Sequence, residues 1–308
     1  MSAERQGSIY VDDISHGSGG VITDQVTSSE FEILRSKEQN LSFETFDDIL
    51  KQKQIILDDA KKLTLGITRG KNIYTNLALL LSEQCEHTIK LNIFNGSSKI
   101  DFRERKEFRG SVINQFYDVC TYIKKSCSTL YPDIAIKEAV SNAIVHRDYT
   151  YSGGIIINIF ADKIEFLSIG GLIGQITLND ILLGMSQSRN EMLANIFYML
   201  MLSETYGAGI QRIYASYINC SQKPSVKISD NVFTITLPNM KFADANLSEH
   251  EQKIMNYLDS HQFINRKQAE KVLYVSQTMA GRVLKKLVEL GLTKQLGNSV
   301  GIKYTINN

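Results

Sequence analysis

The chain has 308 residues, of which 43% are apolar, and a formal net charge of +1. Such a composition is typical of a folded globular protein with two or three domains and excludes a disordered or fibrous chain. No apolar run approaches the roughly 18 residues of a membrane-spanning helix, and the first residues lack the apolar core of a secretion signal. We therefore expect a cytoplasmic protein with no membrane partner. The four cysteines form no CxxC pair, which indicates reduced thiols rather than zinc ligands or disulfides.

Charge is distributed unevenly along the chain. Residues 247–308 carry nine Lys and Arg against five Asp and Glu, a net of +4, whereas residues 126–238 carry seven against nine, a net of −2. A basic tail after a mildly acidic middle is the pattern expected when a nucleic-acid-binding end is attached to a sensing or catalytic body.

The first third of the chain predicts a connecting α+β region. Its elements, in chain order, are a short strand at 8–11, a glycine-rich connection at 16–20, a polar helix at 28–38, a longer helix at 46–63, a short apolar helix at 74–84 and a strand at 88–96 that ends at an Asn-Gly turn. The stretch "GITRGKN" at 66–72 lacks the GxxxxGK[ST] spacing, so a P-loop NTPase is excluded.

The middle of the chain mixes helices and strands. We expect helices at 110–126, 136–149, 178–184 and 190–202, and two hairpins, one at 154–169 with its turn at Ala161-Asp162 and one at 225–238 with its turn at Asp230-Asn231. Pro132 and Asp133 open the second of these helices. The fold class predicted for this part is therefore an α/β sandwich with helices on one face of a mixed sheet.

The last sixty or so residues read as three helices followed by a hairpin, which is the winged form of the helix-turn-helix. Ser248 and Glu251 form a capping box at the first helix, and Gly291 ends the third. We expect the third helix and the wing to contact double-stranded DNA. The candidate base-reading side chains are Gln277, Thr278 and Arg282, and the candidate phosphate contacts are Lys285, Lys286 and Lys294. The alternative is a winged helix that makes dimer or domain contacts.

Three motifs of the middle part carry candidate chemistry. Glu138 and Asn142 are four residues apart and share one helix face, "SIGGLIG" follows a strand, and "YGAGIQRI" places glycines just before a helix. A helix N-terminus after glycines exposes unpaired N–H groups and suits phosphate. Asn142 offers a neutral oxygen to Mg²⁺, and the Glu138 carboxylate can accept a proton from water. Without the glycine motifs, the Glu138 and Asn142 pair would read as a solvated stripe.

These motifs resemble the Bergerat ATP-binding fold of the gyrase, chaperone, histidine-kinase and mismatch-repair superfamily. More closely, "KEAVSNAIVHRDY", "DKIEFLSIGGLIGQIT" and "SRNEMLANIFYMLMLSETYGAGIQRI" look like a bacterial family of transcriptional regulators labelled as RecG-like C-terminal ATP-binding domains. Members normally follow a Schlafen-type AlbA-like domain. The likeness covers residues 99–238, and "GSIYVDD" at the start looks like the last strand of the AlbA-like domain, so the chain resembles a shortened member. No helicase motor motif is present in the sequence.

The resemblance implies roles for particular residues. Glu138 matches the general base and Asn142 the Mg²⁺ ligand, while Gly170, Gly171 and Gly174 match the first glycine box and Gly207 and Gly209 the second, at the triphosphate. Ser168 stands where the superfamily has the aspartate that reads adenine, so this sequence departs from the pattern there. His146 and Arg147 either contact phosphates or cap the C-terminal end of their helix, where cations are favourable.

The sequence as a whole predicts a protein of the α+β class that acts as a DNA-binding regulator, is responsive to ATP with Mg²⁺, and forms a homodimer. The alternatives are an active ATPase with Glu138 as base and a degenerate fold that serves as a dimerisation scaffold. The predicted parts are an AlbA-like remnant at 1–26, a connecting region at 27–108, a Bergerat-like domain at 109–240 and a winged helix-turn-helix at 247–308.

Overall fold

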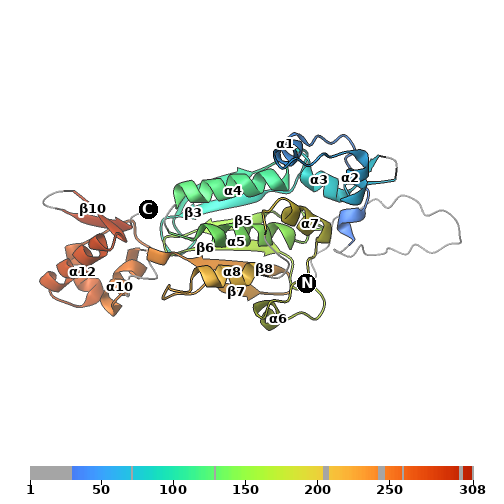
Figure 1. The fold of residues 1–308 in the computed structure, drawn as a ribbon. Helices are drawn as coiled ribbons and strands as arrows, with labels where there is room; N and C mark the ends of the chain where they lie inside the picture. Colours follow the sequence, from blue (N-terminus) through green and yellow to red (C-terminus); the bar gives the residue numbers. More distant parts are fainter. Residues whose placement is uncertain are drawn as a thin grey trace, which may run out of the picture.

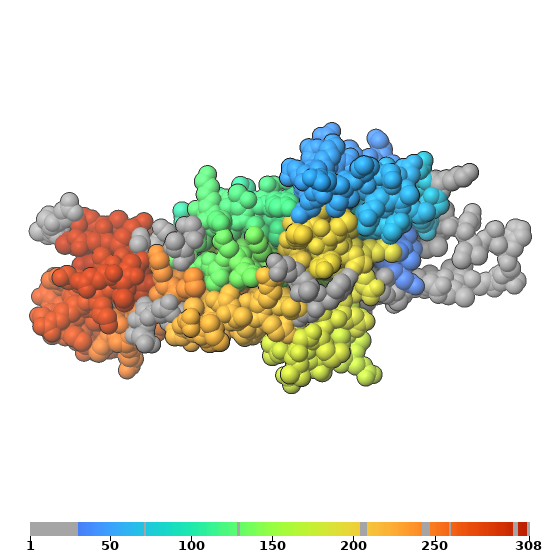
Figure 2. Space-filling model, in the orientation of Figure 1, coloured from blue at the N-terminus to red at the C-terminus, as the bar shows by residue number. Residues whose placement is uncertain are grey.

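The computed structural model describes residues 30–70, 72–127, 130–203, 208–241, 247–258, 260–297 and 301–306. The expected strand at 8–11 and the connection at 16–20 lie outside these residues, as does Gly207. The chain forms a larger body built around a sheet and a smaller C-terminal module at one end of an elongated molecule (Figures 1 and 2). Every described helix is too short or too polar to cross a lipid bilayer.

A six-stranded mixed sheet organises the larger body. Its strand order is β4 (Phe102–Phe108), β3 (Ile89–Phe94), β5 (Ile155–Ile159), β6 (Lys163–Ile169), β8 (Val232–Pro238) and β7 (Ser225–Ile228). The β3 and β5 pair is parallel and the other four pairs are antiparallel. Both predicted hairpins, β5 with β6 and β7 with β8, are confirmed.

Helices cover one face of this sheet (Figure 1). They are α4 (Val112–Ser126), α5 (Asp133–Val145), α7 (Glu191–Met199) and α8 (Gly209–Ser216), with the short α6 (Leu178–Leu182) beside α8. Along β6, Ile164, Phe166 and Ser168 are buried while the residues between them are only partly covered, as expected for one packed face. The predicted sandwich of a mixed sheet and helices is confirmed.

The sheet crosses the boundary predicted at residue 108. Strands β3 and β4 precede that residue, yet they pair with each other and, through β3, with β5, and one hydrophobic core joins both sides. Strand β3 belongs to the same sheet as β5 because the two strands pair in parallel. Such a pair needs a long crossover connection, and here that connection carries α4 and α5. Residues 27–108 therefore do not form a unit separate from 109–240.

The region before β3 differs from two helix predictions. Within the expected helix at 28–38, the described residues hold only the 3₁₀ turn η1 (Phe31–Ile33). The side chain of Glu32 is buried there and accepts hydrogen bonds from the backbone N–H groups of Met192 and Leu193, at 2.9 and 2.7 Å. Burial raises the pKa of Glu32 to about 7. A tertiary contact at the start of α7 thus replaces the local helix pattern.

The expected helix at 46–63 is two helices, α1 (Glu44–Gln52) and α2 (Asp59–Thr64). The chain leaves α1 through Gln54, whose φ is +59°, and the Asp58 side chain caps α2 by accepting from the Lys61 N–H. The short strands β1 (Thr68–Arg69) and β2 (Ile73–Tyr74) and helix α3 (Asn76–Leu81) complete this region. The predicted apolar helix is thus present as α3, and its residues Leu77, Ala78, Leu80 and Leu81 belong to the common core.

The C-terminal module has its own hydrophobic core. Its elements are α10 (Glu249–Leu258), β9 (Ile264–Asn265), α11 (Arg266–Leu273), α12 (Gln277–Glu289), β10 (Thr293–Leu296) and β11 (Lys303–Ile306). The three strands form an antiparallel sheet in the order β10, β11, β9, so a short third strand joins the predicted hairpin. The predicted capping box is confirmed, because the Ser248 N–H donates to Glu251 and the Glu251 N–H donates to the Ser248 hydroxyl.

Candidate functional site

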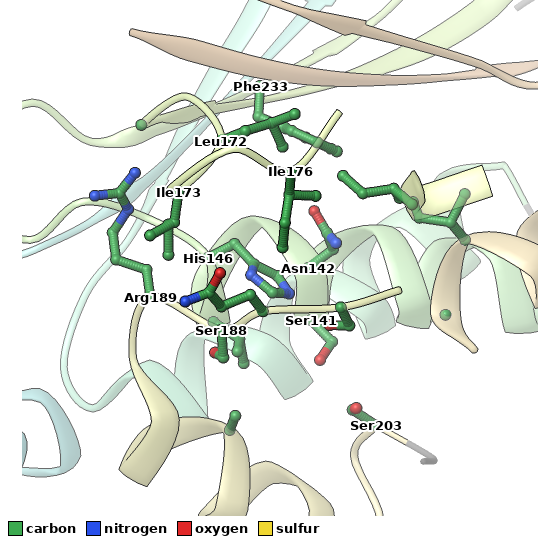
Figure 3. A pocket seen from close by; sticks show the side chains of 18 of the residues that line it. Ser141, Asn142, His146, Leu172, Ile173, Ile176, Ser188, Arg189, Ser203 and Phe233 are labelled. Carbon is green, nitrogen blue, oxygen red and sulfur yellow. The ribbon is translucent and has the colours of Figure 1, made fainter. Parts of the chain in front are cut away.

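A pocket lies on the helical side of the sheet, between α5, the glycine loop after β6, the loop before α7 and the start of α8 (Figure 3). Helix α5 supplies one wall with residues spaced by one or two turns. These residues are Glu138, Ser141, Asn142, Val145 and His146. The sequence-predicted residues Glu138, Asn142, His146, Gly170, Gly171 and Gly209 therefore line one cavity.

His146 ends α5 and contributes its ring to the pocket. Burial, with a smaller effect from the charge of Arg189, lowers the pKa of His146 to about 4. The imidazole is therefore neutral at neutral pH. It can donate or accept a hydrogen bond in the pocket, but it adds no positive charge to it.

The carboxylate of Glu138 lies at the start of α8. Glu138 is buried, and Nη1 of Arg212 donates to its Oε1 over 2.8 Å. A β-carbon at Gly209 would lie only 3.0 Å from the other carboxylate oxygen, so glycine at this position leaves room for the side chain of Glu138. The N-cap residue Ala208 makes no side-chain hydrogen bond to the helix. The pocket thus ends at an uncapped helix N-terminus, which favours negative charge.

The glycine loop after β6 is fitted closely to its neighbours. Gly170 has a φ of +120°, and its N–H donates to the Asn231 carbonyl over 2.9 Å. A β-carbon at Gly171 would lie 2.5 Å from the backbone oxygen of Asp230, in the turn between β7 and β8. Gly174, with a φ of +62°, is not among the residues that line the pocket. Gly170 and Gly171 therefore have a packing requirement in addition to their place in the pocket.

An apolar wall, missed by sequence reasoning, faces α5. It consists of Leu172, Ile173, Ile176 and Phe233, and Figure 3 shows Ile176 between the loop and the His146 ring. The signal for three of its four residues was the run "GGLIGQIT", in which two apolar residues directly follow the glycine pair and Ile176 comes three positions later. A concave site with apolar walls and a few polar groups is the usual form of a small-molecule pocket.

Arg189 is a second residue that sequence reasoning did not assign to the site. It lines the pocket, donates to the Gly171 carbonyl over 3.0 Å and contacts the Asp148 carboxylate at 3.3 Å. The next residue, Asn190, is fully buried and donates to the carbonyls of Val145 and Arg147, over 2.8 and 2.7 Å. This pair of residues therefore holds the glycine loop and the end of α5 in place.

Besides Gly174, two predicted site residues, Arg147 and Ser168, are not among the residues that line the pocket. Arg147 is 1% exposed, and its Nη2 donates to the backbone carbonyls of Tyr151, over 2.6 Å, and Gly153. Its guanidinium also lies 4.6 Å from the Tyr149 ring centroid. Ser168 is buried in β6, and its hydroxyl donates to the Ala143 carbonyl of α5 over 2.8 Å. Both side chains are committed to the protein's own backbone.

The C-terminal module presents a partly basic surface on α12. All six predicted DNA contacts are exposed, namely Gln277, Thr278, Arg282, Lys285, Lys286 and Lys294. Lys286, however, pairs with the buried carboxylate of Glu251 on α10 at 2.9 Å, whereas Lys285 makes only a long exposed pair with Glu289. Arg266, which was not predicted, lies against α12, since a β-carbon at Gly281 would be 3.1 Å from its Nε.

Comparison with known proteins finds a family model that is similar to the middle of the chain. Residues 153–237 match the family model described as "Putative ATP-dependent DNA helicase recG C-terminal". The match supports an ATPase-like nucleotide-binding domain of the RecG C-terminal kind. It includes both glycine motifs but begins after α5, so it does not reach Glu138 or Asn142.

A solved structure shows the same fold over most of the chain. The crystal structure of the DIP2311 protein from Corynebacterium diphtheriae is similar with a TM-score of 0.60 and 15% sequence identity, over 90% of this chain and 70% of that one. No curated protein matches the chain significantly in sequence. The likeness to the RecG C-terminal kind of domain thus rests on the matched family, and the fold on the structural comparison.

The residues of the pocket suit a nucleotide with a phosphate-held cation better than a protein-held metal. No group of three or more His, Cys, Asp or Glu suited to a metal occurs in the described part of the chain. Mg²⁺ bound through phosphates needs only one or two protein oxygens, and the amide of Asn142 can supply one. Among the described lining residues, Glu138 is the sole acidic one, and the other polar side chains offer hydroxyl, amide, imidazole and guanidinium groups to a ligand.

Proposed function

We propose that the protein is a DNA-binding regulator, cytoplasmic and homodimeric, whose larger body binds ATP with Mg²⁺ and whose C-terminal module is a winged helix. The observation that carries the nucleotide part is the pocket itself. It joins the side-chain oxygens of α5, an apolar wall built from the glycine loop and Phe233 of β8, and the uncapped start of α8, all far apart in the sequence.

Within this proposal each part of the pocket has a stated task. The apolar wall covers the base, the start of α8 attracts the phosphates, and Asn142 contributes its amide oxygen to Mg²⁺. Bound Mg²⁺ would neutralise phosphate charge. The carboxylate of Glu138 accepts a hydrogen bond from Arg212, so one of its two oxygens is already engaged, which favours a nucleotide-binding switch over an efficient ATPase.

The winged-helix part of the proposal rests on the order and charge of the C-terminal elements. The C-terminal elements follow the order of a winged helix, with helices α10, α11 and α12 before the hairpin of β10 and β11. In a DNA-binding winged helix the third helix enters the major groove. The exposed side of α12 carries Gln277, Thr278, Arg282 and Lys285, which are suited to base edges and phosphates.

Thermal melting tests the nucleotide proposal. Mg-ATP at about 100 times its Kd should stabilise the protein by about 2.7 kcal/mol, which raises the Tm by roughly 5–10 °C. The measurement compares Mg-ATP with Mg²⁺ alone by differential scanning fluorimetry. Phosphate release is then compared between the parent protein and Glu138→Gln, and equal background rates identify a binder rather than an ATPase. No shift of the Tm at millimolar Mg-ATP would leave the scaffold alternative standing.

Substitutions on α12 test the DNA proposal. Arg282→Ala should reduce the preference for a selected site by about 1–3 kcal/mol, whereas Lys285→Ala should weaken binding to all sequences and lower the salt slope by about one. Lys286→Ala is the matched comparison, because it should lower the stability of the module by leaving the buried Glu251 without its ion pair. Binding is measured by fluorescence anisotropy at several salt concentrations. Equal, sequence-independent losses from Arg282→Ala and Lys285→Ala would count against base reading by Arg282.

A further inference from the structure

An ion pair links Glu138, which lines the pocket, to Arg212 in the middle of α8. The two residues are 74 positions apart, and their side chains are 7% and 26% exposed. Side chains of a helix tilt toward its N-terminus, so Arg212, one turn after Gly209, extends back toward the start of α8 and meets the carboxylate there. The absence of a side chain at Gly209 leaves that path open.

Glu138 and Gly209 line the pocket, whereas Arg212 is not among the described lining residues. The carboxylate of Glu138, rather than the guanidinium of Arg212, therefore borders the cavity. Its position next to the start of α8 is where the phosphates of a bound nucleotide would lie, so the pocket presents an acidic group to an anionic ligand. A carboxylate without its cation would repel that ligand, and burial strengthens the repulsion because water screens it less.

We infer that Arg212 is a positioning residue that acts on the nucleotide through Glu138. It neutralises the carboxylate and holds it against α8, so that a polyphosphate can occupy the same end of the pocket. This inference rests on the proposed nucleotide function and adds to it a residue outside the pocket wall. It differs from direct recognition, in which Arg212 itself would touch a phosphate oxygen.

A double-mutant cycle separates these two roles. The proteins compared are the parent, Arg212→Gln, Glu138→Gln and the double variant, and the measurement is the Kd of a fluorescent ATP analogue with Mg²⁺. Arg212→Gln should weaken binding about tenfold or more, and Glu138→Gln should leave it unchanged or tighten it a few-fold. In the double variant the affinity should return to within about threefold of Glu138→Gln, because the charge that needed neutralising is gone.

A ligand without phosphates gives a second readout. Arg212→Gln should leave the affinity for adenosine unchanged within about twofold, since adenosine carries no charge to be repelled. Arg212→Lys keeps a cation on the same helix face and should retain ATP affinity within about threefold. Both measurements are made at a temperature where the melting curve shows each variant to be folded.

Three results would overturn the inference. A loss of ATP affinity that persists in the double variant shows that Arg212 contacts the phosphates itself. Equal losses for ATP and adenosine show a structural role, and unchanged ATP affinity in Arg212→Gln shows no role. In each of these cases the parent still binds ATP, so the proposed function survives. Absence of ATP binding by the parent and by every variant would instead reject the nucleotide function together with the role of Arg212.

Discussion

Replacing Arg147 with methionine is expected to lower the free energy of unfolding by about 2–4 kcal/mol. Methionine preserves most of the volume but cannot donate to the carbonyls of Tyr151 and Gly153, which the buried guanidinium holds at the entry to β5. The loss of these charge-assisted hydrogen bonds costs more free energy than is gained by no longer burying a cation. Urea denaturation followed by circular dichroism measures the change.

The same substitution distinguishes a structural arginine from a ligand-binding one. Because Arg147 points away from the pocket, the Kd for Mg-ATP should change by less than about twofold at a temperature where the variant is folded. His146→Gln is the neighbouring control, since His146 lines the pocket and its replacement should act mainly on affinity. Unchanged stability combined with a large loss of affinity for Arg147→Met would show that the guanidinium reaches the ligand.

Gly171→Ala should destabilise the protein by about 1–3 kcal/mol and weaken nucleotide binding. The added carbon would lie 2.5 Å from the backbone oxygen of Asp230 and 2.8 Å from that of Ser229, and backbone atoms cannot move aside as a flexible side chain can. The glycine loop must then lift from the turn between β7 and β8, and it carries Leu172, Ile173 and Ile176 of the apolar wall with it. Melting temperature and Kd for the ATP analogue report the two effects.

Gly174→Ala is the matched control for this substitution. It lies in the same loop, and its added carbon would have only the Gln187 side chain within reach, at 3.8 Å. Its φ of +62° makes alanine unfavourable by about 1–2 kcal/mol, without a clash against the β7 and β8 turn. Stability should fall in both variants, and affinity chiefly in Gly171→Ala. Equal losses of affinity would indicate that backbone strain anywhere in the loop, rather than the Gly171 contact, controls the pocket.

Local sequence patterns predicted the central elements of the fold well. Strand β6 shows the alternation of a half-buried strand, the Ala161-Asp162 turn links it to β5, and Pro132 opens α5, so each carries its own signal. Strand β4 carries no such signal. Its sequence "FRERKEF" is almost entirely charged, and it lies at the edge of the sheet with only Phe108 buried. The sequence therefore did not reveal that the sheet begins before residue 109.

The candidate site was predictable to the extent that it depends on one helix face and its glycine loops. Glu138, Asn142 and His146 are spaced by four residues, and helical geometry alone brings them to one wall of the pocket. Arg147 is one residue further along the chain and faces the opposite direction, where backbone carbonyls bind it. A string of polar residues at a helix end cannot show which of them faces a ligand and which supports the backbone.

The sequence by itself determined the central helices and the two hairpins of the larger body, the shared face of Glu138 and Asn142, and the capping box of the C-terminal module, because periodicity and capping depend on residues a few positions apart. Only the tertiary structure decided which partner each charged group took. Glu32 binds the start of α7, and Arg147 binds backbone carbonyls at the entry to β5. Lys286 pairs with the buried Glu251, and Arg212 pairs with the carboxylate of Glu138. A charged or polar side chain takes whichever partner the packing brings within hydrogen-bond distance, and the contact of Glu32 with Leu193 joins residues that are 161 positions apart. The chemistry available to the pocket therefore depends on contacts between segments that lie far apart in the chain.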